Sequence, residues 1–333
     1  MKIPKITKIL ILGGDSITLE ILPLLKKSFN YLLLCSKRNL DSKINEKRLE
    51  DHLIALKANY RKINILEKSI DFNKNFNSKN SIYLCMSSPW IIKKNNFKKI
   101  KSLILNSHST RLPQYRGGAT FSWLVMNKVR FGFNNLYIID KNIDTGKIIF
   151  FEEFLYPNNL KTPDDYFQIY KKKQMEFLNK KLLNFKKKKN TLVPTKQLEY
   201  LSSYFPRLNS NIHGWVDWSL DYNDLYAFIN SFGNPHEGCS TYYKSQKVLI
   251  KDASPNHEDA KVNSYKNGII FRKGPNWVCV AANNGSIIIE KVIYKKQNII
   301  NKLRVGDRLF TPLNKIENKF KRVFYNPKGL VKK

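Results

Sequence analysis

Short apolar runs alternate with amphipathic stretches through the first 110 residues. The run Lys8 to Leu12 ends in Gly13-Gly14, a pattern typical of a buried parallel strand followed by a turn. Apolar residues from Ile17 to Leu25 then recur at helical spacing, and residues 51–59 can form a second helix. Three more runs have strand character: Tyr31–Cys35, Ser81–Met86 and Leu103–Asn106. Strands that alternate with helices predict a parallel sheet covered on both faces.

A longer helix follows this region and precedes a domain boundary. Thr162-Pro163-Asp164-Asp165 combines a hydroxyl cap, a proline in the first turn and acids at the positive end of the helix dipole. The pattern predicts a helix that begins there and runs to about Phe185. Pro194 and Pro206 then indicate a boundary at 190–210.

The second half of the chain has a different pattern of apolar runs. Short strand-like runs at 248–250, 268–271, 277–280 and 286–289 are separated by turns and predict a small β-barrel. We therefore expect an α/β chain with four parts. These are a Rossmann-like domain at 1–190, a linker at 191–210, a β-barrel domain at 211–320 and a basic tail at 321–333.

The formal net charge of +33 admits two explanations. A polyanionic partner, such as a nucleic acid, a phosphorylated substrate or an acidic membrane surface, would attract such a chain. An AT-rich coding sequence would also enrich lysine, and lysine supplies 48 of the 59 basic residues. Because dedicated phosphate recognition favours arginine forks, the second explanation is the stronger one.

The four cysteines, Cys35, Cys85, Cys239 and Cys279, are scattered without a CxxC or CxxH spacing. This spacing predicts neither a metal site nor a disulfide framework, and it favours a reduced, cytoplasmic protein. The sequence also has no window that approaches the roughly 20 apolar residues of a membrane helix. We expect no signal peptide and no membrane partner.

Two polar segments carry candidate chemistry. Asn106-Ser107-His108 stands at the end of a predicted strand, and Asp144-Thr145-Gly146 follows about 30 residues after the glycines at 117–118. Transfer of an acyl group to an amine needs a donor for the oxyanion, a group that accepts a proton and a group that orients it. Asn, His and Asp are the right residue types. Either segment alone is more often structural, so spacing alone does not decide the function.

Residues 106–151 resemble the signature of the 10-formyltetrahydrofolate-dependent formyltransferases. That family reads Asn-x-His, then Ser-Leu-Leu-Pro-x-Tyr-Arg-Gly, and later Asp-x-Gly. Here Ser109 to Gly117 stands in the middle, with Thr110 and Arg111 in place of the common Ser and Leu. The resemblance implies that His108 acts in proton transfer and that Asn106 binds the oxyanion. It also implies that Asp144 orients His108 and helps to deprotonate the amine.

The same resemblance implies binding residues for the cosubstrate 10-formyltetrahydrofolate, and no metal. The pteridine would lie against two loops, whose residues are Met86, Ser87, Ser88, Pro89, Trp90, Ile91, Ile139, Asp140, Lys141 and Asn142. Contacts with the substrate would come from the loop after His108, namely from Ser109, Tyr115, Arg116 and Gly117.

The sequence departs from the family at two places. Many members carry His seven residues before the Asp, where this chain has Tyr137, and residues 132–136 differ from the usual Gly-Val-Thr. The first 80 residues match only in outline. A Rossmann dehydrogenase is a poor alternative, because the turn Gly13 to Ile17 lacks the Gly-x-Gly-x-x-Gly fingerprint.

The resemblance continues from Phe205 to Thr241, which is similar to the opening of the C-terminal oligonucleotide-fold domain of methionyl-tRNA and amino-sugar formyltransferases. We expect a nucleotide-linked amino sugar as acceptor, because residues 215–218 and 235–241 look closer to that branch. The loop 36–51 is also shorter than the basic insertion that the methionyl-tRNA branch usually carries in its first domain. Methionyl-tRNA is the alternative acceptor, and the charge favours it. A hydrolase that releases formate and a non-catalytic nucleic-acid binder stay open, as does a homodimer.

Overall fold

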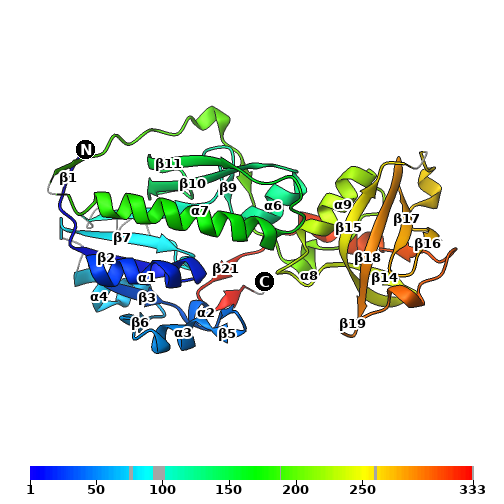
Figure 1. Cartoon of the computed structure of the whole chain (residues 1–333), viewed down its shortest axis with the longest axis horizontal. Helices are drawn as coiled ribbons and strands as arrows, with labels where there is room; N and C mark the ends of the chain where they lie inside the picture. The colour runs from blue at the N-terminus through cyan, green and yellow to red at the C-terminus, as the bar shows by residue number, and fades with distance from the viewer. Residues whose placement is uncertain (75–77, 93–101, 188, 259–260, 332–333) are drawn as a thin grey trace.

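The computed structural model of the protein describes residues 1–74, 78–92, 102–187, 189–258 and 261–331. Two domains lie side by side along the long axis of the molecule (Figure 1). The larger one holds the N-terminus and the long helix α7 (Pro163–Asn184), and the smaller one is built mainly from strands. The expected domain boundaries at residues 190, 210 and 320 stay a prediction.

The larger domain is built on a mixed sheet, with the strand order β11-β10-β8-β7-β2-β3-β6 in the described part of the chain. The parallel strands are β2 (Lys8–Gly13), β3 (Asn30–Cys35), β6 (Tyr60–Lys62), β7 (Ser81–Met86) and β8 (Leu103–His108). Two further strands, β10 (Phe131–Ile138) and β11 (Ile148–Leu155), pair antiparallel beyond β8. The Rossmann-like sheet is confirmed, but the expectation of a parallel sheet holds only for five of these seven strands.

Alternate residues of the central strand β2 enter two different cores. Ile9 and Ile11 pack with helices α1 (Ser16–Ser28) and α7, whereas Leu10 and Leu12 pack on the other face of the sheet. That second face is covered by the short helices η1 (Leu66–Lys68) and α4 (Ile70–Lys74), through Leu66 and Phe72. Burial on both faces explains why the strand is a continuous apolar run in the sequence.

Helix α7 begins where its sequence predicts. The Thr162 hydroxyl accepts a hydrogen bond from the Asp165 backbone N–H, and the Asp165 carboxylate accepts one from the Thr162 backbone N–H in return. This reciprocal cap satisfies donors that the first turn of a helix leaves unpaired. The shorter helices of this domain are α2 (Lys37–Leu40), α3 (Leu49–Ala55) and α6 (Thr120–Met126), and β4 (Lys43–Ile44) pairs with β5 (Lys47–Arg48).

The segment that connects the domains is anchored at both ends. It begins with β12 (Lys189–Thr191), which pairs with β1 (Lys2–Pro4). It then runs along the larger domain (Figure 1), through η2 (Glu199–Leu201), to β13 (Tyr204–Phe205). Strand β13 pairs in parallel with β9 (Arg116–Gly117), so the linker lies against the loop that follows His108.

The smaller domain is a curled antiparallel sheet. Its strand order is β16-β17-β18-β15-β14-β20, with β19 (Gln297–Asn298) beside β18. The strands are β14 (Cys239–Tyr243), β15 (Gln246–Asn256), β16 (Ile270–Lys273), β17 (Val278–Ala282), β18 (Gly285–Tyr294) and β20 (Leu309–Phe310). Backbone hydrogen bonds from Ile270 N to Asp307 O and from Leu309 N to Gly268 O join its two edges. The expected small β-barrel is thereby confirmed, and α9 (Tyr222–Ser231) packs on its core.

The last residues return to the larger domain. After α10 (Leu313–Ile316) and η5 (Glu317–Phe320), strands β21 (Tyr325–Asn326) and β22 (Gly329–Leu330) form a small hairpin near α2 (Figure 1). The sequence predicted only a basic tail at 321–333, of which 332–333 lie outside the described residues. Within the described ranges no helix is both long and apolar enough to cross a membrane.

Candidate active site

A cavity of about 550 Å³ opens at the carboxyl ends of strands β7 and β8. It is lined by residues from the turn after β2, from the loop after β7, from β8 itself and from the loop between β10 and β11. Asn106, His108 and Asp144 all line it. Asp144 stands 36 residues after His108 in the sequence, yet both contribute to one cavity, at the edge where parallel α/β sheets usually hold their ligands.

Tyr137 connects Asn106 to Asp144. Asn106 and Tyr137 stand directly opposite each other on the antiparallel pair β8–β10, which puts their side chains on one face. The Asn106 Nδ2 donates to the Tyr137 hydroxyl over 2.8 Å, and that hydroxyl donates to Asp144 Oδ1 over 2.5 Å. Burial, and then the charge of Asp144, raises the pKa of Tyr137 well above its usual value. The phenol therefore stays protonated at neutral pH and acts as the donor to Asp144.

His108 is held by a different set of partners. Its Nε2 lies 2.8 Å from the Tyr115 carbonyl oxygen and 2.8 Å from Thr110 Oγ1, and the Thr110 hydroxyl itself donates to Tyr115 O. A carbonyl oxygen only accepts, so Nε2 carries the hydrogen and Nδ1 is the nitrogen that accepts a proton in the neutral ring. Among the described residues no hydrogen bond joins Asp144 to His108. In this structure Thr110 and Tyr115 hold the His108 ring, and the orienting role expected of Asp144 stays a prediction.

The loop that carries Asp144 has an unusual backbone. Asp144 adopts a left-handed conformation with φ of 57°, which aspartate tolerates better than most residues. Both carboxylate oxygens accept hydrogen bonds, one from Tyr137 and the other from the Gly117 backbone N–H over 2.8 Å. Two residues on, a Cβ at Gly146 would lie 1.6 Å from the Ile138 carbonyl oxygen, so only glycine fits there. These constraints fix the direction of the Asp144 carboxylate.

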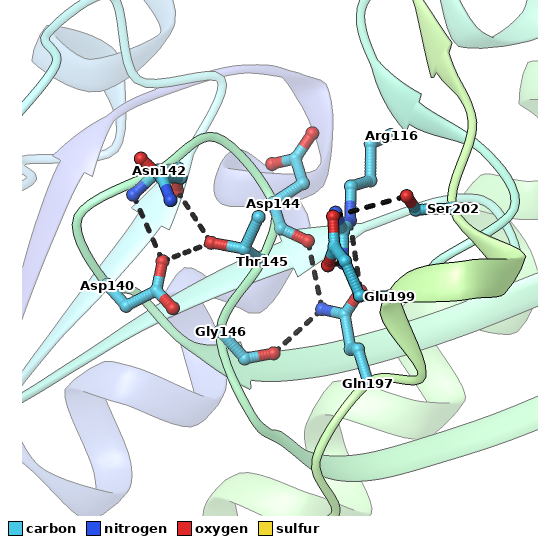
Figure 2. A network of polar contacts seen from close by, with 9 residues as sticks. All are labelled: Arg116, Asp140, Asn142, Asp144, Thr145, Gly146, Gln197, Glu199 and Ser202. Carbon is cyan, nitrogen blue, oxygen red and sulfur yellow. Dashed lines mark hydrogen bonds and ion pairs between the residues drawn. The ribbon is translucent and has the colours of Figure 1, made fainter.

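A buried amide supports the same loop from the linker, as Figure 2 shows. The Gln197 Nε2 donates to the carbonyl oxygens of Asp144 and Gly146, over 2.9 and 2.7 Å. Its Oε1 accepts from the guanidinium group of Arg116. Gln197 is only 6% exposed, which strengthens these bonds because little water competes for them.

Arg116 is paired inside the protein. Its guanidinium group forms two hydrogen bonds of 2.9 Å with the Glu199 carboxylate, in addition to those with Gln197 (Figure 2). Neither Arg116 nor Tyr115 lines the cavity, whereas Ser109 and Gly117 do. In this structure the Arg116 side chain anchors the linker and the Tyr115 ring stacks on Phe205 at 4.8 Å, and the expected substrate contacts of these two residues stay a prediction.

All ten residues expected to contact the folate line the cavity. They come from the loop after β7 and from the loop after β10. Residues 88–92 lack regular secondary structure, so their backbone amides and carbonyls are not committed to a sheet ladder or a helix. Trp90, which belongs to this segment, is half-buried. A flat heterocycle that needs both donors and acceptors, such as a pteridine, fits such a wall.

Sequence reasoning missed several residues at this site. Gln197 carried no recognisable signal, because it acts through a contact that the fold creates, and Thr110 was noted only as a departure from the motif, with no signal for its contact with His108. Tyr137 did carry a signal, since it replaces a histidine common in the family. Part of the cavity wall comes from the C-terminal tail, namely from residues 322–325. Within the described ranges no group of three or more His, Cys, Asp or Glu side chains is placed to hold a metal ion.

Comparison with known proteins finds a similarity for the smaller domain. Residues 210–303 match the family model for the C-terminal domain of formyl transferases. The matched residues include α9 and most of the curled sheet, so the similarity falls on the barrel predicted from the strand pattern.

Curated and solved proteins extend the similarity to the larger domain. The chain is 25% identical over 207 residues to methionyl-tRNA formyltransferase of Clostridium tetani, a match that covers 62% of this chain and 64% of that protein. The chain thus spans less than two thirds of the length of the first curated relatives it matches.

Two solved structures have the same fold, each at 21% identity. The sugar 3N-formyl transferase WlaRD, solved with dTDP and 5-N-formyl-THF, matches with a TM-score of 0.66 over 87% of this chain and 99% of its own. The N-formyltransferase of Helicobacter canadensis, solved with folinic acid and dTDP-3-aminofucose, matches with a TM-score of 0.65 over 86% and 100%. The resemblance that begins at residues 106–151 is confirmed at the level of the fold across both domains.

Proposed function

We propose that the protein is an N-formyltransferase that moves a formyl group from 10-formyltetrahydrofolate to the primary amine of a nucleotide-linked amino sugar. The observation that carries this proposal is the single cavity that holds Asn106, His108 and Asp144 together with both expected folate loops. The similar proteins named above support it, because all three are formyltransferases and two of them were solved with a formylated folate.

The donor would supply an amide-like formyl carbon, which is open to attack by an amine. The Asn106 amide has two N–H groups, and one of them donates to Tyr137. The second is free to donate to the formyl oxygen as negative charge develops there, an interaction that typically contributes about 100- to 1000-fold in rate. The bond to Tyr137 fixes the plane of the amide, so this donor needs no reorientation during the reaction.

The proton of the attacking amine needs an acceptor. His108 Nδ1 suits this role, because its Nε2 is engaged with Tyr115 and Thr110 and because His108 lines the cavity. Asp144 lines the same cavity, and its expected help in deprotonating the amine stays a prediction. In this structure Asp144 acts on Asn106 through Tyr137.

Methionyl-tRNA is the second candidate acceptor. It is favoured by the curated relatives and by the net charge of +33, since phosphate contacts dominate nucleic-acid affinity. The sugar-nucleotide acceptor is favoured by the solved structures, which match nearly their whole length, and by the short segment 36–51.

An assay that compares acceptors tests the proposal. The protein is incubated with 10-formyltetrahydrofolate and, in parallel, with 3-amino and 4-amino deoxysugar nucleotides or with methionyl-tRNA, and the products are identified by mass spectrometry. We expect a formylated sugar nucleotide. Formylation of the tRNA alone would show that methionyl-tRNA, and not a sugar nucleotide, is the acceptor. Release of formate without any acceptor would indicate a hydrolase. Binding of RNA without turnover of the folate would indicate a nucleic-acid binder.

A further inference from the structure

A second cavity of about 610 Å³ adjoins the first one and lies between the two domains. Its walls include Leu208 and His236 from the side of the smaller domain. Five residues line both cavities: Thr120, Phe121, Phe167, Arg207 and Tyr325. The two cavities therefore border on the same residues, and a ligand that reached from one to the other would pass along them.

Two arginines meet at one tyrosine where the cavities join. The Arg38 Cζ lies 5.1 Å from the centre of the Tyr325 ring, and the Arg207 Cζ lies 5.7 Å from it. The three residues come from α2, from the linker after β13, and from the terminal hairpin. The chain has only 11 arginines among its 59 basic residues, so two of them at one ring is not a consequence of the lysine-rich composition.

Neither guanidinium group has a carboxylate partner among the ion pairs of the described residues. Burial, and then repulsion from Arg207, lowers the pKa of Arg38. Asp164 also lines the second cavity, where its carboxylate accepts a hydrogen bond from Gln168 Nε2. A Cβ at Gly118 would lie 2.5 Å from Arg207 Cγ, so the glycine leaves room for the Arg207 side chain. The fold thus holds two positive groups close together without a paired acid, an arrangement that an anion would stabilise.

The tail that supplies Tyr325 is fastened in place. The Tyr325 hydroxyl accepts a hydrogen bond from Asn209 Nδ2 over 3.1 Å. His213 accepts from the Asn209 backbone N–H at Nδ1, so its Nε2 carries hydrogen and donates to the Lys321 carbonyl oxygen over 2.8 Å. The ring of Tyr325 is therefore positioned before any ligand arrives.

We propose that Arg38, Arg207 and Tyr325 bind the phosphate groups of the formyl acceptor, a nucleoside diphosphate joined to the amino sugar. This inference rests on the proposed function. Arginine forks match phosphate oxygens with two parallel hydrogen bonds, and the ring of Tyr325 holds the two forks near one another. Phosphates at this junction would leave the sugar in the first cavity, with its amine toward His108, and the nucleoside in the second.

Calorimetric titrations with dTDP and with inorganic pyrophosphate, in the absence of formyl transfer, test the site by measuring the Kd of each. We expect thymidine to bind far more weakly than dTDP. Arg38→Gln and Arg207→Gln should each raise the Kd for dTDP about 10- to 100-fold, because each removes charge-assisted hydrogen bonds. Arg61→Gln, which removes the same charge from an exposed position on β6, should leave that Kd unchanged. The Kd for 5-formyltetrahydrofolate should be the same in all these variants.

Substitutions at residue 325 separate the ring from its hydroxyl. Tyr325→Phe keeps the aromatic ring beside the arginines and should change the Kd for dTDP by less than about threefold. Tyr325→Ala should raise that Kd nearly as much as the arginine substitutions do. An equal Kd for dTDP in the wild type, Arg38→Gln and Arg207→Gln would overturn the proposal. So would binding of a tRNA acceptor stem, and not of dTDP, that depends on the two arginines. Because these measurements need no catalysis, their failure is distinct from failure of the formyl-transfer assay.

Discussion

The hydroxyl group of Tyr137 donates a hydrogen bond to the carboxylate of Asp144 over 2.5 Å while it accepts one from the amide of Asn106 over 2.8 Å. Two of the residues that line the cavity are thus linked through a third. The link is buried, since Tyr137 is 3% exposed and Asp144 is 8% exposed. Water competes little for these bonds, and each one strongly restricts the side chains it joins.

Replacing Tyr137 with Phe should slow formyl transfer about 10- to 100-fold. The change removes a hydrogen bond to a carboxylate, which is typically worth about 1.5–3 kcal/mol, and frees the Asn106 amide to rotate. Steady-state kinetics should show the loss in kcat, with the KM for the folate nearly unchanged, because the ring itself is kept. An unchanged kcat would show that Tyr137 only fills space.

Tyr156→Phe is the matched control for that variant. Tyr156 is fully buried, and its hydroxyl has no hydrogen-bond partner. Removing an unsatisfied buried hydroxyl should leave activity unchanged and leave the free energy of unfolding equal or higher. Equal losses of kcat in both variants would mean that the loss of any buried tyrosine hydroxyl in this domain lowers activity. The effect at Tyr137 could then not be assigned to its hydrogen bond with Asp144.

Replacing Gln197 with Leu should loosen the loop that carries Asp144. The variant loses the donor to the carbonyl oxygens of Asp144 and Gly146 and leaves the Arg116 guanidinium with Glu199 alone. Each buried polar group left unpaired costs about 1–3 kcal/mol, so we expect lower stability in urea titrations together with lower kcat. Glu199→Gln, at an exposed carboxylate, should change the free energy of unfolding by less than about 1 kcal/mol. Equal effects of the two substitutions would contradict this interpretation.

Gly146→Ala should be far more harmful than Gly306→Ala. A Cβ at residue 146 would overlap the Ile138 carbonyl oxygen, and relief of that overlap requires the backbone of the Asp144 loop to move. We expect a loss of roughly 3 kcal/mol or more in unfolding free energy, with loss of activity. At Gly306 no atom lies within 4 Å, and only the positive φ of 90° opposes a side chain, at about 1–2 kcal/mol. Thermal denaturation of both variants checks the difference.

The thiols of Cys35 and Cys85 should resist alkylation in the folded protein. Burial raises the pKa of each to about 12. Only on the order of one thiol in ten thousand is then ionised at pH 8, and the thiolate is the reactive form. Treatment with iodoacetamide at pH 8, followed by peptide mass spectrometry, should modify both residues in urea but not in buffer. Rapid modification of either in buffer would contradict the burial described here.

The sequence predicted best those elements whose pattern records burial on both faces. Strand β7 occupies Ser81–Met86 as expected, because all six residues are buried in the sheet. Strand β10 was missed, since Asn134 and Asn135 interrupt its apolar pattern although both are buried. The Asn135 amide donates to the carbonyl oxygens of His108 and Thr110, so a tertiary contact explains a residue type that strands usually avoid.

The site was predictable where chemistry repeats in a motif and unpredictable where the fold brings remote segments together. Asn106, His108, Asp144 and the two loops expected to contact the folate were all named from the sequence, and they line one cavity, while their roles stay predictions. Arg116 was assigned to the substrate because it stands in the motif, yet Gln197 and Glu199, about 80 residues away, bind it. Tyr325 illustrates the same limit, because no local pattern indicates that the tail returns to the cavity.

The most direct test of the account is the rate of tetrahydrofolate formation from 10-formyltetrahydrofolate with an amino-sugar nucleotide, compared between the wild type, His108→Ala and Asn106→Ala. We predict acceptor-dependent turnover by the wild type and a loss of about 100- to 1000-fold in each variant. Binding of 5-formyltetrahydrofolate should stay within a few-fold of the wild-type Kd. Turnover by the variants at the wild-type rate, or a wild type that forms tetrahydrofolate with neither a sugar nucleotide nor methionyl-tRNA, would contradict the assignment of this cavity to formyl transfer.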